Sequence, residues 1–212
     1  DLRMSRGLGD VYKRQIEDDP YGELRYEGET MPTLKSLDTQ GNVIFLGSFS
    51  KIFMPGLRIG WMVAAHDILD KAVMLKQTVD LQTSSFAQRQ ASYYIDMYDL
   101  DAHVKHIRDL YGKRRTLMYD SMKKYFPEGV SFTYPEGGLF TWVTLPECLD
   151  AKAMMPEVIE KKVAYVPGGA FYPNGGNANH FRLNYSNMPE DRIVEGLSLI
   201  HISEPTRHAQ IS

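Results

Sequence analysis

Two short runs of apolar residues constrain the fold of this chain more than any other feature. The first, residues 43–46 (Val-Ile-Phe-Leu), lies between glycines at 41 and 47, and the second spans residues 59–65. Such runs, when turn residues bound them, predict strands that are buried on both faces of a sheet. Helical spacing of apolar residues follows in 66–79, and strands alternating with helices are typical of an α/β fold.

The remaining elements are predicted from the same two periodicities. Residues 22–41 are rich in turn formers and are expected to form a surface loop. Further helices are expected at 85–98, with a cap among residues 83–85, and at 101–126, 151–161 and 189–197. Short strands are expected at 130–134, 139–145, 163–166 and 181–184. This order predicts an α/β domain over 16–112, followed over 113–198 by a connecting helix and a small α+β domain.

The composition excludes several classes of protein. A net charge of −3 gives no reason to expect a nucleic-acid or acidic-lipid partner, and the basic residues 113–115 are expected to form a solvated helix face. No apolar run approaches the roughly 18 residues of a membrane span. Cys148 is the only cysteine, which fits a reducing, cytoplasmic location. His103 and His106 share a helix face with Asp109 one turn on, but no further ligand of suitable spacing joins them, so no metal site is expected.

The two ends of the chain differ in texture from the rest. Residues 1–15 and 199–212 carry no useful period and resemble translated sequencing-adapter read-through. A buried strand ending near Asp18 should follow several apolar residues, yet residues 12–15 (Tyr-Lys-Arg-Gln) are mostly polar or basic. We therefore expect both end segments to be non-native and leave them out of the fold prediction.

The strongest chemical feature is a lysine that directly follows the first apolar run. Lys51 would sit at the carboxyl edge of the sheet, where open α/β sheets bind ligands. Hydroxyls at Ser48 and Ser50 precede it, and the guanidinium of Arg58 follows seven residues later. Hydroxyls with an arginine can hold a phosphate. A lysine beside them is placed to form an imine with a phosphorylated aldehyde.

Two further groups fit the same chemistry. Asp18 ends an apolar strand, where its carboxylate can pair with a pyridine nitrogen, and the phenol of Tyr21 can reach a ring oxygen. Arg182 is flanked by apolar strand residues, where a guanidinium is costly to bury unless it meets an anion. The carboxylate of an amino-acid substrate is such an anion and matches the guanidinium in shape.

These segments together resemble the class I/II aminotransferases, the fold-type I family that uses pyridoxal 5'-phosphate (PLP). The string SFSKIFMPGLRIGW, residues 48–61, is similar to the lysine motif of that family. Residues 18–21 match its D-x-x-Y motif, and residues 182–186 match R-L-N-[FY]-[SA]. The similarity is greatest to the branch that contains 2-aminoadipate aminotransferases and MocR regulators. Residues 135–140 and 166–171 resemble two glycine-containing segments of the family.

The resemblance implies a role for each of these residues. Lys51 would carry the cofactor as a Schiff base, and Arg182 would bind the substrate carboxylate. The remaining cofactor contacts would come from Asp18 on the pyridine nitrogen, Tyr21 on the ring oxygen, and Ser48, Ser50 and Arg58 on the phosphate.

The resemblance also implies a fold and an activity. The fold would be a partial PLP-transferase large domain with a mixed, mainly parallel sheet, followed by a small α+β domain. The complete protein would be a homodimeric transaminase that moves an amino group from an amino acid to a 2-oxo acid. The upstream glycine-rich phosphate loop of the family has no counterpart here, so we expect the 212 residues alone to be inactive. The alternatives are the effector domain of a MocR-type regulator, with a DNA-binding domain upstream, and a PLP-dependent lyase.

Overall fold

The computed structural model describes residues 14–200 and contains two compact units. The first unit ends at Ile107 and the second begins at Arg108. This division and the predicted boundary after residue 112 both fall within the long helix α4 (Leu100–Tyr125). The domain ranges assigned from the sequence stay a prediction, and each unit is described by itself below.

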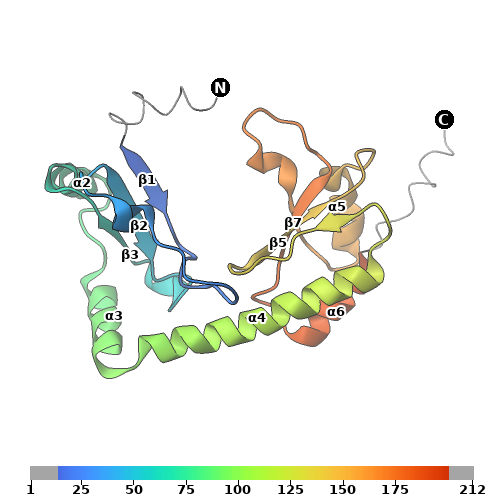
Figure 1. The fold of residues 1–212 in the computed structure, drawn as a ribbon, viewed down its shortest axis with the longest axis horizontal. Coiled ribbons are helices and arrows are strands. Elements are labelled where there is room, and N and C mark those ends of the chain that lie inside the picture. Colours follow the sequence, from blue (N-terminus) through green and yellow to red (C-terminus); the bar gives the residue numbers. More distant parts are fainter. Residues whose placement is uncertain (1–13, 201–212) are drawn as a thin grey trace. The chain divides into compact units, whose positions relative to one another are not determined.

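The first unit contains a mixed three-stranded sheet with the order β1-β2-β3 (Figure 1). Strand β1 (Gln15–Asp18) pairs in parallel with β2 (Val43–Ser48), and β2 pairs antiparallel with β3 (Gly60–Val63). The predicted mixed sheet is confirmed, with one parallel and one antiparallel pairing among the described strands. The parallel pairing matters for function, because it places the carboxyl ends of β1 and β2 at one edge of the sheet.

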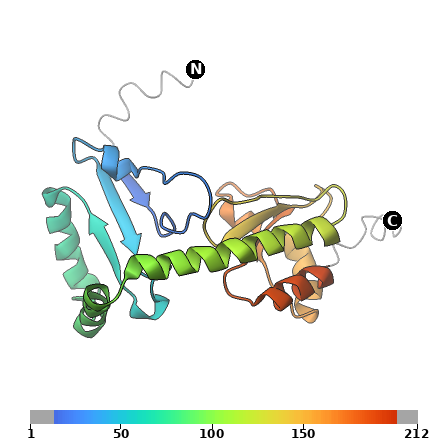
Figure 2. The ribbon, with the colours of Figure 1, turned by 60° about the horizontal axis from the view of Figure 1, so that its bottom comes forward.

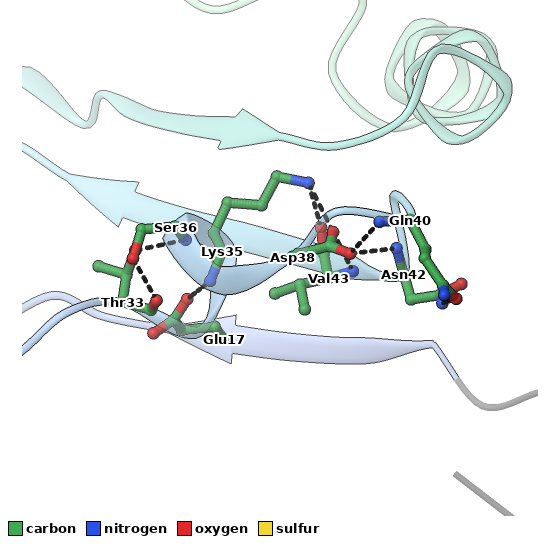
Figure 3. A network of polar contacts seen from close by, with 8 residues as sticks. All are labelled: Glu17, Thr33, Lys35, Ser36, Asp38, Gln40, Asn42 and Val43. Carbon is green, nitrogen blue, oxygen red and sulfur yellow. Dashed lines mark hydrogen bonds and ion pairs between the residues drawn. The ribbon is translucent and has the colours of Figure 1, made fainter. Parts of the chain in front are cut away.

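The segment predicted as an irregular loop contains a short helix, α1 (Leu34–Leu37). Thr33 caps it by accepting a hydrogen bond from the Ser36 amide at 3.0 Å. The carboxylate of Glu17, on β1, accepts bonds from the amides of Leu34 and Lys35 at 2.8 and 2.9 Å, and Figure 3 shows the bond from Lys35. This cap comes from 17 residues away in the chain, which explains why local sequence patterns did not predict the helix.

Asp38 holds the chain between α1 and β2 in place (Figure 3). Its Oδ1 accepts from the amides of Gln40 and Asn42, both at 3.1 Å. Its Oδ2 accepts from the Val43 amide at 2.9 Å and from the Lys35 ammonium at 3.1 Å. These donors, led by the Val43 amide, hold the pKa of the Asp38 carboxyl well below its usual range. The start of β2 is therefore fixed by a charged group.

Helices α2 (His66–Val79) and α3 (Ser85–Met97) follow the sheet, as predicted, and Ser84 caps α3. Strand β2 is buried or half-buried throughout, but the prediction of strands buried on both faces is wrong for β1 and β3. Ile16 on β1 is 67% exposed and Val63 on β3 is 47% exposed. None of the residues on α2 is buried either. The apolar runs identify the strands, but residues on β1 and β3 stay exposed among the described residues.

The second unit is built on a four-stranded antiparallel sheet with the order β4-β5-β7-β6. After α4, the elements of this unit in chain order are β4 (Ser131–Phe132), β5 (Phe140–Thr144), α5 (Ala151–Glu160), β6 (Val166–Pro167), the 3-10 helix η2 (Gly168–Phe171), β7 (His180–Asn184) and α6 (Glu190–Leu199). Figure 2 shows α6 beside the C-terminal half of α4, where Arg114 and Glu190 form an ion pair. Buried side chains from β5, β7, α4 and α6 form the core, among them Val143, Phe181, Met122 and Ile193.

Two predictions in this unit need correction. The strand expected at 163–166 begins only at Val166, because Lys162 adopts a left-handed conformation (φ 61°) and the Val163 amide bonds back to Val158. The solvated basic face expected at 113–115 is wrong for its two arginines. Arg114 is half-buried and Arg115 is buried, and both bond to backbone carbonyls.

The foreign origin of the two ends stays a prediction. Gln15 pairs with Val43 in β1, α6 continues to Leu199, and Ile200 is buried at 2% exposure. The rest of both segments, residues 1–13 and 201–212, lies outside the described residues. Among the helices that the structure describes, none is long and apolar enough to cross a membrane.

Candidate active site

The first candidate site lies at the edge of the sheet where β1 and β2 end. Asp18 is opposite Leu46, and the next amide, that of Asp19, donates to the Leu46 carbonyl at 3.0 Å. The chain then continues two residues further on β2 to Ser48. Asp18 and the segment that carries Ser48, Ser50 and Lys51 are therefore brought to one edge of the sheet.

Three consecutive carboxylates end β1, and the structure separates their roles. Glu17 caps α1, as described above. Asp19 accepts a bond from the Gly22 amide at 2.6 Å, and a Cβ at Gly22 would lie only 2.1 Å from the Asp19 carboxylate. Asp18 is exposed, and its carboxylate has no hydrogen-bond partner among residues 14–200. Of the three, Asp18 is therefore the one available to a ligand.

Tyr21 lies in the turn that follows Asp18 and is half-buried. Its carbonyl accepts from the amide of Leu24 at 2.8 Å, and the Leu24 side chain is fully buried. This apolar anchor holds the turn that carries the phenol.

Lys51 sits in a tight turn directly after β2. The amides of Phe53 and Met54 both donate to the Phe49 carbonyl, at 2.9 and 3.1 Å. The Ser48 hydroxyl accepts from the Ser50 amide at 3.1 Å. Lys51 is half-buried, and its amine has neither an ion pair nor a hydrogen bond within the part of the chain that the structure describes. The turn therefore fixes the lysine backbone and leaves the amine available.

Strand β3 begins at the same edge of the sheet, so Arg58, two residues before the strand, also lies there. Ser48 is opposite Gly60, and the Phe49 amide donates to the Ile59 carbonyl at 3.1 Å. Arg58 itself adopts a left-handed conformation (φ 55°) and donates one bond to the Pro55 carbonyl at 3.2 Å. A guanidinium has five N–H donors, so this bond leaves donors for an anion.

An aromatic cluster supports the lysine turn and was not predicted from the sequence. The rings of Phe49 and Trp61 lie 4.8 Å apart, and those of Phe53 and Tyr94 lie 4.3 Å apart. His103, which the sequence raised as a metal candidate, packs edge-on against Phe53 at 6.4 Å. Among the described residues, no group of three His, Cys, Asp or Glu side chains could hold a metal ion.

The second candidate site surrounds Arg182 on β7. Its guanidinium carbon lies 3.9 Å from the centre of the Phe140 ring and 4.7 Å from that of Phe171. Trp142 is its cross-strand neighbour on β5. The Nε of Arg182 is buried and has no hydrogen-bond partner among the described residues. A guanidinium held between rings, with a buried donor unpaired, is prepared to receive an anion.

The two phenylalanines are functional candidates that the sequence analysis did not single out. A signal was present, because Gly137-Gly138-Leu139-Phe140 and Gly168-Gly169-Ala170-Phe171 have the same pattern of two glycines, an apolar residue and phenylalanine. Gly138 has a φ of +82°, and a Cβ at Gly168 would lie 2.6 Å from that of His180. One glycine of each pair, Gly138 or Gly168, therefore permits the backbone path that leads to the phenylalanine beside Arg182.

The structure thus distributes the predicted residues over two sites. The first unit holds Asp18, Tyr21, Ser48, Ser50, Lys51 and Arg58, and the second unit holds Arg182. No predicted site residue falls outside the described part of the chain.

Comparison with known proteins finds aminotransferases. The chain is 46% identical to aromatic-amino-acid aminotransferase 1 of Thermococcus litoralis, over 86% of this chain and 44% of that protein. It is 35% identical to the 2-aminoadipate transaminase of Thermus thermophilus, over 92% and 48%. A solved kynurenine aminotransferase of Pyrococcus horikoshii, in complex with PMP, superposes with a TM-score of 0.83 at 48% identity, over 87% of this chain and 46% of that one.

The chain is also similar to proteins named as transcriptional regulators. The chain is 30% identical to the uncharacterized HTH-type transcriptional regulator YisV of Bacillus subtilis, over 81% of this chain and 35% of that protein. The chain therefore spans less than half the length of each of these curated relatives. Residues 16–200 match the family described as aminotransferase class I and II. The protein belongs to the aminotransferase class I and II family.

Proposed function

We propose that the complete protein is a PLP-dependent aminotransferase that transfers an amino group from an amino acid to a 2-oxo acid. The observation that carries the proposal is the parallel pairing of β1 with β2. It puts the available carboxylate of Asp18 and the available amine of Lys51 at one sheet edge. The relatives named as aminotransferases support this reading over the alternatives.

The residues of the first unit fit the cofactor. The Lys51 amine, free of ion pairs among residues 14–200, would attach to the aldehyde of the cofactor. The Asp18 carboxylate would hold a proton on the pyridine nitrogen, and the phenol of Tyr21 would hydrogen-bond the ring oxygen. The hydroxyl of Ser48 and the guanidinium of Arg58 would bind the phosphate, with Ser50 as a further contact.

The proposed chemistry divides between the cofactor and the chain. Bound PLP supplies an electron sink for the charge that develops at the substrate α-carbon. The Lys51 amine, once the substrate amine has displaced it, would act as general base and remove the α-proton. It would then act as general acid and return the proton to a carbon of the cofactor. Arg182 would bind and orient the carboxylate that amino-acid and 2-oxo-acid substrates share.

Two alternatives use the same cofactor residues. A transcriptional regulator would use them to sense an amino acid, and similarity to YisV supports that reading. A lyase would break a bond on the substrate side chain instead of exchanging the amino group. A homodimeric assembly and a cytoplasmic location stay predictions.

Borohydride reduction of the complete protein, loaded with PLP, tests the proposal. Peptide mapping is expected to find the reduced cofactor on Lys51 and to leave Lys76, an exposed lysine of α2, unmodified. Lys51→Ala is expected to lose both the label and transamination. Label at another lysine, with Lys51 free, would refute the assignment.

A product assay separates the alternatives. An aminotransferase is expected to convert an amino acid and a 2-oxo acid into their exchanged partners in equal amounts. Ammonia release with loss of the substrate side chain would identify a lyase. Binding of the amino acid without turnover would favour the regulator.

A further inference from the structure

Two adjacent arginines on α4 each hold one of the segments that flank Arg182. Arg115 is 3% exposed, and its Nη1 donates to the Pro135 carbonyl at 2.6 Å. Its guanidinium carbon also lies 3.9 Å from the centre of the Tyr134 ring. A buried guanidinium is stabilised when a donor and its flat face find partners, as those of Arg115 do. Both partners of Arg115 lie at the start of the segment 134–140.

Arg114 reaches the other segment. Its Nη1 donates to the Ser186 carbonyl at 2.7 Å, and its Nε lies 3.6 Å from the Glu190 carboxylate. The Ser186 amide and hydroxyl in turn donate to the side-chain oxygen of Asn184, at 2.8 and 2.9 Å. Arg114 therefore fixes the turn that ends β7, two residues beyond Arg182.

The two held segments are also bonded to each other. The Tyr185 amide donates to the Leu139 carbonyl at 3.2 Å, and its hydroxyl donates to the Gly137 carbonyl at 3.2 Å. Tyr185 is fully buried. Segment 134–140 ends at Phe140, whose ring stacks on the Arg182 guanidinium. The contacts form a continuous path from α4 to the guanidinium of Arg182.

We propose that Arg114 and Arg115 are positioning residues that set the orientation of Arg182 toward a substrate carboxylate. This inference rests on the proposed role of Arg182. It accounts for two charged groups that the cofactor chemistry does not use. Arg115 acts through Tyr134, Pro135 and Phe140, and Arg114 acts through the turn at 184–186.

Kinetics of the complete protein test the functional part. Arg115→Gln is expected to raise the KM of the amino acid about tenfold, because Arg182 would be misaligned and its contact with the carboxylate weakened but not removed. The kcat is expected to change much less, and Arg115→Lys to restore only part of the loss, because lysine lacks the planar fork. Lys113→Gln, at the exposed neighbouring position, is the matched control and is expected to behave as wild type.

A substrate comparison isolates the carboxylate. The amine that corresponds to the amino acid without its carboxylate gains nothing from Arg182. Its turnover is expected to be equal in Arg115→Gln and wild type. An equal loss for both compounds would mean general damage to the fold and would overturn the proposal.

Hydrogen–deuterium exchange tests the structural part without reference to activity. Peptides covering 134–140 are expected to exchange faster in Arg115→Gln, and peptides covering 184–187 faster in Arg114→Gln, with both unchanged in Lys113→Gln. Unchanged exchange in both arginine variants would overturn the proposal, and so would faster exchange with an unchanged KM. If the wild type catalyses no transamination, the proposed function fails, while the exchange data still decide whether the arginines hold these segments.

Discussion

The guanidinium of Arg182 lies against the ring of Phe140, with 3.9 Å between the guanidinium carbon and the ring centre. Stacking of this kind contributes about 0.5–2 kcal/mol. Phe140→Leu keeps an apolar side chain but removes the aromatic face. We expect it to raise the KM of the amino acid by about threefold to tenfold and to change the melting temperature little. Steady-state kinetics and thermal unfolding of the complete protein would measure both effects.

Phe171 provides the comparison for this prediction. Its ring centre is farther from the guanidinium carbon, at 4.7 Å, and its side chain is more exposed. Because solvent weakens the interaction, Phe171→Leu is expected to raise KM less than Phe140→Leu does. The reverse order would show that the stacking distance does not govern carboxylate binding.

Gly47, directly before Ser48 on β2, leaves room for the ring of Trp61 on the neighbouring strand β3. A Cβ at Gly47 would lie 2.2 Å from the indole ring, so Gly47→Ala must displace Trp61 or separate the strands. Overpacking of this kind is expected to lower the free energy of unfolding by about 1–3 kcal/mol. Tryptophan fluorescence should report the displacement of Trp61. Gly56→Ala is the control, because a Cβ there has nothing within 4 Å, and wild-type stability is expected.

Asp38 makes the stability of the first unit depend on acid pH. Its folded-state pKa lies well below the unfolded value of about 3.9, because the Val43 amide and its other donors favour the carboxylate. The stabilisation is therefore complete above about pH 4 and is lost as the pH falls below it toward the folded pKa. Asp38→Asn is expected to lower stability at neutral pH and to flatten its decline in acid.

Chemical unfolding between pH 7 and 2 would measure this difference. Asp70→Asn, an exposed position on α2, serves as the control and is expected to leave the pH profile unchanged. A profile for Asp38→Asn parallel to that of the wild type would contradict the assignment.

The sequence predicted those elements that are determined by residues close together in the chain. Helix α2 spans His66–Val79 as its apolar spacing indicates, and Ser84 caps α3 as its hydroxyl suggests. The lysine turn and its position after β2 were also predicted, because a strand followed by Ser48 and Lys51 is a sequence-local pattern. The family match over residues 16–200 confirms the family that these local motifs indicated.

Features that depend on distant residues were not predicted. The cap of α1 comes from Glu17 on another element. Arg115 looks like part of a charged, exposed helix face in the sequence, but the carbonyl that makes its burial possible belongs to Pro135, 20 residues away. The exposure of β1 and β3 was also not predicted, because the apolar character of a strand does not show whether another layer covers it.

Tyr165 gives a prediction at the alkaline end of the pH scale. Its side chain is buried, and its hydroxyl donates to the Ala151 carbonyl at 2.6 Å, at the start of α5. Burial raises the pKa of Tyr165 to about 12, above the unfolded value of about 10. The stabilisation is therefore complete below about pH 10 and is lost as the pH rises toward 12.

Tyr165→Phe is expected to lower stability by about 1 kcal/mol at neutral pH, through loss of the hydrogen bond, and to reduce the decline above pH 10. Unfolding at pH 7 to 11, with Tyr93→Phe as the exposed control, would measure both, and a steeper alkaline decline in Tyr165→Phe would contradict the prediction.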